Sequence, residues 1–276
     1  MPSLGELKKR LKSARTIEQL SGAMRSAATA KYLKLSSALS GFAPYSAAIR
    51  ETSDAVERSG AGSGEKGEKR VFVLLSGNHG LCGGYHQELF RFFTETALEY
   101  EKDPMIITCG KKAYDFCSSK GLSVIKSFSV PDVPSYDDAQ AVISFLEELF
   151  AQSDEAVSVS IVYQKFFNML KSRPVSEVLK LKASETGVSG SDETLFIPDR
   201  ASVSSGLFAF ALDADMYRKL LSAASAAQAA TVVAMRSAYD NAKRSISGLE
   251  SKINRLRQAA VTASVLETSV GIKEQL

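Results

Sequence analysis

The sequence predicts an α/β protein in which two long terminal helices pair with each other and a small α/β domain is inserted between them. Three observations support this fold class: a long proline-free stretch near the C-terminus, a helical stripe at the N-terminus, and strands that alternate with helices in the middle. We expect the helices at residues 1–58 and 207–276, and the inserted domain at residues 69–200.

The C-terminal helix is indicated by residues 207–270, which lack proline and hold almost no glycine. Apolar residues recur there at steps of three and four, the period of a helix that buries a narrow stripe. At a rise of about 1.5 Å per residue, roughly 60 helical residues would span about 90 Å, so a rod of this length needs a partner. The expected stripe comprises Ala234, Ala238, Ala242, Ile246, Leu249, Ile253, Leu256 and Ala260.

The partner is predicted at the N-terminus. Ser3 and Glu6 have the spacing of a capping box, in which each side chain accepts a hydrogen bond from the other residue's backbone N–H. Both segments are rich in alanine, and small side chains let helix axes approach closely, so we expect a tight two-stranded pair. The alternative is two unrelated amphipathic helices packed on one core. The expected N-terminal stripe comprises Leu4, Leu7, Leu11, Ala14, Ile17, Leu20, Met24, Ala27 and Ala28.

The region between the helices predicts a doubly wound, Rossmann-like sheet that is mostly parallel. Residues 60–69 have the glycine-rich composition of a flexible linker. After the linker, runs rich in β-branched and apolar residues alternate with amphipathic segments. We expect strands at residues 70–76, 104–110, 123–128, 157–163 and 174–182, and helices at residues 87–100, 111–120 and 136–151.

Composition excludes several classes of protein. The chain has 276 residues, 45% of them hydrophobic and 24% charged, and no run approaches the ~20 apolar residues of a membrane span. We expect no signal peptide, because the N-terminus has no apolar h-region. Three cysteines without a C-x-x-C pair, beside only two histidines, argue against a zinc site and for a reduced compartment. These residues are Cys82, Cys109, Cys117, His79 and His86.

The sequence gives little support for an active site or a cofactor. The first predicted strand is followed by Gly80-x-x-Gly83-Gly84, which is neither G-x-G-x-x-G nor a P-loop. These glycines are better explained by a tight turn between strand and helix. Ser76 does not lie in G-x-S-x-G, and no nucleophile–base arrangement is evident. We therefore predict no catalytic, cofactor-binding or metal-binding residues and no direct small-molecule substrate.

Three motifs in the expected order resemble the gamma subunit of F-type ATP synthases. The first comprises residues 10–15 (RLKSAR), 20–25 (LSGAMR) and Ala30-Lys31. The second is GLCGG at residues 80–84, after its strand. The third is VAMRSAYDNA at residues 233–242 with Asn254-x-x-RQAAVT at residues 257–262.

The resemblance implies a non-catalytic shaft. In that family the terminal helices form an antiparallel coiled coil that enters a hexamer of alpha and beta subunits. The foot of the shaft binds the epsilon subunit and the membrane c-ring, so torque couples ion flow to ATP synthesis or hydrolysis. It also implies a peripheral membrane protein on the cytoplasmic side of a bacterial cell membrane, while the coupling ion, H⁺ or Na⁺, stays open.

The resemblance further implies which residues touch other subunits. Arg257 and Gln258 match an arginine–glutamine pair that contacts a loop of a beta subunit, and the planar fork of arginine can donate two hydrogen bonds to a carboxylate. The remaining subunit-contact residues expected on this basis are Met24, Arg25, Asp240, Asn241 and Glu267.

The chain departs from the family pattern at several positions. Gly22 stands where lysine is common, and Ala227 and Thr231 stand where a glutamate and an arginine are usual. Ala263-Ser264 replaces a common Gln-Glu pair. These changes indicate a divergent branch and bear on the partner contacts rather than on the architecture.

Two other functions remain open on sequence alone. One is a nucleotide-binding α/β enzyme with helical extensions, which would bind a nucleotide in its middle domain. The other is a basic coiled-coil module for nucleic acid, suggested by Lys8, Lys9, Arg10, Lys12 and Arg15. No aromatic side chains suited to base stacking accompany that cluster, so we expect no nucleic-acid partner.

Overall fold

The computed structural model describes residues 3–57, 69–100, 104–151, 157–179 and 200–273. Two long helices, α1 (Leu4–Glu57) and α5 (Arg200–Lys273), pass through two compact units. One unit, called here the helical pair, combines Met1–Ala27 with Val232–Leu276, and the other, called the α/β unit, is Ala28–Thr231.

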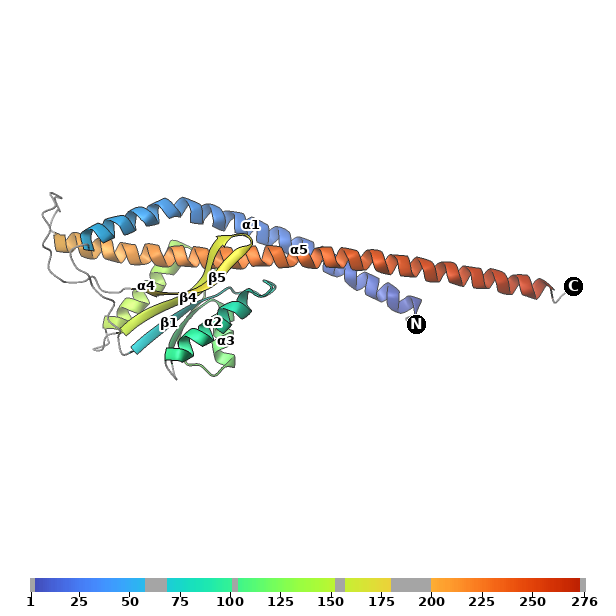
Figure 1. Ribbon diagram of the computed structural model, residues 1–276, viewed down its shortest axis with the longest axis horizontal. Helices are drawn as coiled ribbons and strands as arrows, with labels where there is room; N and C mark the ends of the chain where they lie inside the picture. Colours follow the sequence, from blue (N-terminus) through green and yellow to red (C-terminus); the bar gives the residue numbers. More distant parts are fainter. Residues whose placement is uncertain (1–2, 58–68, 101–103, 152–156, 180–199, 274–276) are drawn as a thin grey trace. The chain divides into compact units, whose positions relative to one another are not determined.

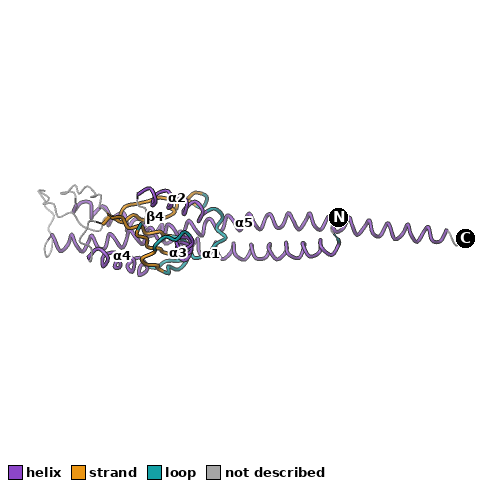
Figure 2. The backbone as a smooth tube through the Cα atoms, turned by 90° about the horizontal axis from the view of Figure 1, so that it is seen from below, coloured by secondary structure: helices purple, strands orange, loops and turns teal. Residues whose placement is uncertain are grey.

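The helical pair is antiparallel. Arg15 pairs with Glu250 at 2.7 Å, while Arg25, further along α1, lies 4.9 Å from the ring centre of Tyr239, which comes earlier on α5. Figure 2 shows the two helices side by side in this unit. The predicted capping box is confirmed at the start of α1, since Ser3 N donates to Glu6 Oε2 at 3.1 Å and Glu6 N donates to Ser3 Oγ at 3.2 Å.

Both helices of the pair bury residues at a seven-residue repeat. Leu7, Ala14 and Ser21 are buried on α1, and on α5 Met235 and Ala242 are buried while Leu249 and Leu256 continue the same repeat half-buried. A strict repeat of seven gives a left-handed two-stranded coil, because it keeps one stripe on the partner helix. The C-terminal stripe predicted from the sequence is confirmed as far as Leu256, whereas Ala260 is exposed.

The predicted N-terminal stripe is partly wrong. Ile17 and Leu20 are 52% and 58% exposed, and Leu4 and Ala27 are also exposed. The seam passes instead through Ser21, whose hydroxyl donates to the carbonyl of Ile17. Ile17 and Leu20 are apolar, but they fall between the buried positions of the seven-residue repeat, which places Ser21 in the seam despite its polarity.

A charge placed in this seam should separate the helices. Ala242 is 6% exposed, so Ala242→Glu combines overpacking with burial of a carboxylate, and we expect the pair to lose roughly 2–4 kcal/mol. The neighbouring Lys243 is exposed, so Lys243→Glu should cost within about 0.5 kcal/mol. Thermal unfolding followed by circular dichroism measures both; equal shifts in melting temperature would contradict the assigned seam.

The α/β unit is built on a five-stranded sheet in the order β3-β2-β1-β4-β5. All neighbours are parallel except β4 and β5, which form an antiparallel hairpin. This confirms the predicted mostly parallel, doubly wound sheet. The elements are β1 (Lys69–Leu75), α2 (Tyr85–Tyr100), β2 (Met105–Cys109), α3 (Lys111–Ser119), β3 (Val124–Phe128), α4 (Tyr136–Ala151), β4 (Val157–Asn168) and β5 (Lys171–Leu179).

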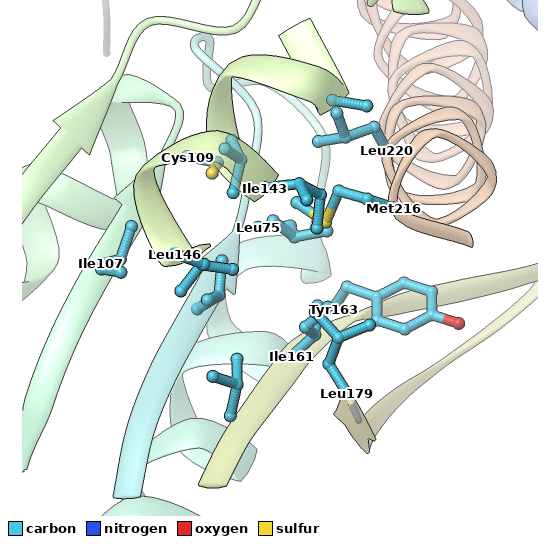
Figure 3. Close-up of a cluster of buried hydrophobic side chains, with 14 of the residues drawn as sticks. Leu75, Ile107, Cys109, Ile143, Leu146, Ile161, Tyr163, Leu179, Met216 and Leu220 are labelled. Carbon is cyan, nitrogen blue, oxygen red and sulfur yellow. The ribbon is translucent and has the colours of Figure 1, made fainter. Parts of the chain in front are cut away.

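The chain order places helices on both faces of this sheet. From β1 the chain moves outward to β2 and β3, and α2 and α3 pack on one face with Phe72, Leu74 and Ile106. It then crosses back past β1 to β4, so a right-handed crossover puts α4 on the opposite face. There the side chains of α4 join those of the sheet and of α5, including Met216 and Leu220, as Figure 3 shows.

The hairpin differs from the sequence prediction. β4 continues to Asn168, and β5 begins at Lys171 rather than near Pro174. The predicted linker lies outside the described residues as far as residue 68, and Lys69 already begins β1. Among the described residues, no helix is long and apolar enough to cross a membrane.

A charged cluster ties α5 to the hairpin. Asp215 accepts hydrogen bonds from Lys219 and from Arg218, the latter at 2.8 Å. Lys219 is 2% exposed and also lies 3.5 Å from Glu177 of β5, which accepts a hydrogen bond from Lys165 of β4 at 3.0 Å. Burial alone would raise the pKa of Asp215, but the charges and hydrogen bonds of Lys219 and Arg218 outweigh it and lower that pKa.

Candidate subunit-contact surface

The outer part of α5, defined here as Arg257 to Leu266, presents its side chains to solvent. Every described side chain from Arg257 to Leu266 is exposed, because the seam with α1 ends at Leu256. Arg257 has no ion-pair partner among the described residues, and Gln258 is engaged there only through its backbone carbonyl, which accepts from Thr262 Oγ1 at 3.0 Å. The guanidinium and amide are therefore available to another molecule.

The predicted residues Met24 and Arg25 lie nearer the seam. Both are half-buried, and the Arg25 guanidinium stands over the ring of Tyr239. A Cβ added at Gly22 would meet the same ring at 3.6 Å. At that distance an added Cβ would make an ordinary van der Waals contact with Tyr239, whose ring holds Arg25 by a cation–π interaction.

The remaining predicted residues divide into two groups. Asp240 and Asn241 are exposed, and Asn241 Oδ1 accepts a hydrogen bond at 2.7 Å from Arg244 of the same helix. That described bond runs along α5 rather than across to α1. Glu267 belongs to α5, but its side chain lies outside the described residues. Among the described side chains, Asp240 and Asn241 are not brought together with Arg257.

The basic residues at the start of α1 point to solvent. Lys8, Lys9, Arg10 and Lys12 are exposed, and Arg15 forms an exposed ion pair with Glu250. An exposed pair of this kind contributes about 0–1 kcal/mol, so this face adds little to stability.

In the α/β unit, backbone amides at the N-terminus of α3 donate hydrogen bonds to side chains of the same unit. In nucleotide-binding folds the amides at such an end receive a phosphate. Here Lys111 N donates to Asn78 Oδ1 at 3.0 Å, and Ala113 N donates to Ser76 Oγ at 2.8 Å. Side chains of the β1–α2 loop therefore satisfy these amides at the start of α3. The glycine-rich part of that loop makes a turn in which Gly83 has φ +59°.

Helix α5 fills the crevice where such folds bind a ligand. Open α/β sheets bind ligands beyond the carboxyl ends of the strands, where the strand order reverses. That position, between β1 and β4, is covered by alanines of α5, and the Tyr85 hydroxyl donates to the Ala223 carbonyl at 3.2 Å. The remaining hollow of about 30 Å³ has room for a water or two, whereas ligand pockets measure about 300–1,000 Å³.

The cysteines are not reactive groups. All three are free and buried. Burial raises the pKa of the Cys109 thiol to about 12 and that of Cys117 to about 11, and it also raises the pKa of Cys82. A thiol with a raised pKa is protonated at neutral pH and is a poor nucleophile or metal ligand.

Comparison with known proteins decides the family. A family model described as ATP synthase matches residues 3–273. The ATP synthase gamma chain of Pelotomaculum thermopropionicum is 28% identical over 278 residues, covering 97% of each chain, and that of Rubrobacter xylanophilus is 28% identical over 284 residues, covering 98% of each. The chain belongs to the ATP synthase gamma family. It is a non-catalytic central-stalk subunit of the rotor.

The fold of this gamma subunit also matches solved central stalks. A chain of the mitochondrial ATP synthase of Euglena gracilis superposes with a TM-score of 0.71 at 16% identity, covering 99% of this chain and 94% of the other. One from Tetrahymena thermophila gives a TM-score of 0.61 at 18% identity, covering 79% of this chain and 99% of the other.

Two residues that depart from the family pattern lie within the α/β unit of this gamma subunit. Ala227 is buried against the core of the sheet, and Thr231 Oγ1 donates to the Ala227 carbonyl at 2.8 Å.

The charged cluster at Asp215, Arg218 and Lys219 was not predicted from the sequence. Its signal was present, because an acid followed three and four residues later by two bases places all three on one side of a helix.

Proposed function

We propose that this gamma subunit is a shaft that transmits torque between a membrane c-ring and a catalytic hexamer of alpha and beta subunits. In this role it couples ion flow to ATP synthesis or hydrolysis and has no active site of its own. The observation that carries the proposal is the outer part of α5, where ten consecutive residues, 257–266, expose their side chains beyond the seam.

An unpaired helical end of this kind needs a partner. Most helical stability in proteins comes from packing of one face, and beyond Leu256 this stretch has no packed face among the described residues. This one also exposes three large apolar side chains, Val261, Val265 and Leu266, each by about 60%. Burial of this surface in the hexamer supplies the missing contacts.

Arg257 and Gln258 are proposed to contact a beta subunit as the shaft turns. Both are exposed on the unpaired part of α5, and Arg257 has no described ion-pair partner. Arginine can donate two parallel hydrogen bonds to a carboxylate, and each charge-assisted bond contributes about 1.5–3 kcal/mol. A contact of this strength can be made and broken during rotation.

Further contacts follow from the same proposal. Met24, Arg25, Asp240, Asn241 and Glu267 would meet the hexamer lower on the shaft, while the α/β unit would bind the epsilon subunit and the c-ring. The basic start of α1 would then face protein rather than nucleic acid. We infer a peripheral position on the cytoplasmic side of a bacterial membrane, supported by the bacterial origin of the gamma chains described above.

Replacing Arg257 and Gln258 together by alanine should uncouple the complex without preventing its assembly. Alanine preserves helix propensity, so α5 should stay folded. Loss of two or more hydrogen bonds should reduce ATP hydrolysis or ion pumping by roughly tenfold or more. Both activities are measured in the purified complex, reconstituted into vesicles for pumping.

The control is a matched pair on α2. Gln87 and Arg91 are also exposed, and their double replacement by alanine removes the same two side chains away from the shaft. This control should keep full activity. Full activity in the Arg257/Gln258 double variant, with loss in the control, would place the working contact elsewhere.

A further inference from the structure

The turn between β4 and β5 displays the most exposed large apolar side chain among the described residues. Leu170 is 86% exposed, and Phe167, two residues from the turn, is 53% exposed. Both belong to the α/β unit, in the hairpin drawn in yellow in Figure 1. Two large apolar side chains are thus exposed within four residues of one turn.

This hairpin tip, defined here as residues 167–173, is held in one conformation. The pairing register shifts between Phe166 and Asn168, so Phe167 is the extra residue of a β-bulge. Bulges re-aim a side chain, and this one leaves Phe167 exposed. Asn168 Oδ1 accepts a hydrogen bond from Leu170 N at 2.9 Å, which fixes the turn that presents Leu170.

The hairpin tip is also positively charged. No acidic residue occurs between positions 157 and 176. Lys165 is paired with Glu177, whereas Lys171 and Arg173 are exposed and have no acidic partner among the described residues. Lys171 Nζ lies 5.7 Å from the centre of the Phe167 ring, so a cation and an apolar surface are presented together.

The tip is not suited to accepting an added strand. Pro174 lies in the middle of β5 and has no N–H to offer, and Lys171 and Arg173 lie on the same edge strand. Proline and lysine on an edge strand prevent pairing with another strand. A partner must therefore contact the side chains at the tip.

We propose that the hairpin tip is a docking surface for an acidic segment of another protein subunit of the same assembly. The segment places apolar side chains against Phe167 and Leu170 and carboxylates against Lys171 and Arg173. Phenylalanine and arginine are both enriched at protein interfaces, and charge complementarity fixes the register of the contact. This proposal rests on membership of a multisubunit complex and names a contact that the shaft helices do not make.

Site-specific crosslinking tests the proposal in the intact complex. Leu170 is replaced by p-benzoylphenylalanine, the complex is purified from membranes, and the product of illumination is identified by mass spectrometry. We expect a crosslink to a segment of another subunit that is rich in aspartate and glutamate. The same replacement at Phe167 gives a second position in case the Leu170 variant folds poorly.

Charge reversal provides the matched comparison. Lys171→Glu with Arg173→Glu should lower the crosslink yield roughly fivefold to tenfold. Lys111→Glu with Lys120→Glu, which changes two exposed cations of the same unit, should leave the yield unchanged. A crosslink to lipid, to a second copy of this chain or to a segment without acids, or none in an assembled complex, overturns the docking surface. Failure of the unmodified chain to co-purify with other subunits would instead overturn the proposed function.

Discussion

Replacing Asp215 by alanine is expected to destabilise the α/β unit by about 3–5 kcal/mol. Among the described residues, the change leaves Lys219, which is 2% exposed, with Glu177 at 3.5 Å as its one acidic neighbour. A buried ammonium that loses its main partner is shielded from water and keeps only this longer contact to stabilise its charge. Chemical denaturation measures the loss.

Removing both charges distinguishes two contributions to the free energy of unfolding: the cost of leaving a buried charge without its partner, and the net stabilisation by the ion pair. The double variant Asp215→Leu with Lys219→Met should recover most of the lost stability, because well-packed apolar side chains often replace a buried ion pair without cost. An exposed pair on α2 gives the control: Glu95→Ala removes the partner of Arg91 and should cost within about 0.5 kcal/mol. Equal losses for Asp215→Ala and the double variant would show that shape rather than charge matters here.

The same cluster predicts a dependence on pH. The pKa of Asp215 is lowered in the folded protein, so its contribution is fully present above the unfolded value of about 3.9 and is lost as pH falls through the folded value. The difference in stability between the original protein and Asp215→Ala should therefore be the same at pH 7 and pH 5. A difference that shrinks by pH 5 would contradict the lowered pKa.

Replacing Gly110 by alanine should also destabilise the α/β unit strongly. Gly110 has φ +97°, a conformation that side-chain-bearing residues rarely adopt, which costs about 1–3 kcal/mol. An added Cβ would lie 2.3 Å from the carbonyl oxygen of Ser76, and relieving that overlap should cost about 1–3 kcal/mol more. The overlap is with the backbone of Ser76, the residue directly after β1, whereas Gly110 directly precedes α3. It can therefore be relieved only by moving the sheet or the helix.

Gly121 provides a control that isolates the two costs. It also has a positive φ of +69°, but an added Cβ would meet nothing within 4 Å. Gly121→Ala should therefore cost only about 1–2 kcal/mol. Melting temperatures of the two variants distinguish the terms, and a Gly110→Ala variant as stable as Gly121→Ala would mean that the close approach to Ser76 is absent.

Much of the architecture could be predicted from local patterns. The capping box at Ser3 and Glu6 and the alternation of strands with helices depend on neighbours in sequence, and the structure has both. The family followed from motifs at residues 80–84 and 233–262, which were recognisable without coordinates. The availability of Arg257 and Gln258 was not among these features, because the predicted stripe ran on to Ala260 and only the structure shows that the seam ends at Leu256.

Other features could not be predicted because they depend on residues distant in sequence. Whether Ile17 or Ser21 faces α5 is decided by the supercoil of two helices more than 200 residues apart. The glycine-rich turn after β1 was interpreted from the sequence as a tight turn, but that α5 covers the carboxyl ends of the strands could be seen only in the structure.

The sequence by itself determined which segments are helix and strand and to which family the chain belongs, since periodicity, capping and motifs are properties of neighbouring residues. Only the tertiary structure decided which side chains remain free for partners. Leu170 has the same apolar side chain as Leu220, yet the first stands on a hairpin turn and the second is buried between α5 and the sheet. The reason is that a side chain is buried by its contacts with the rest of the folded chain, and most of those contacts come from segments distant in sequence.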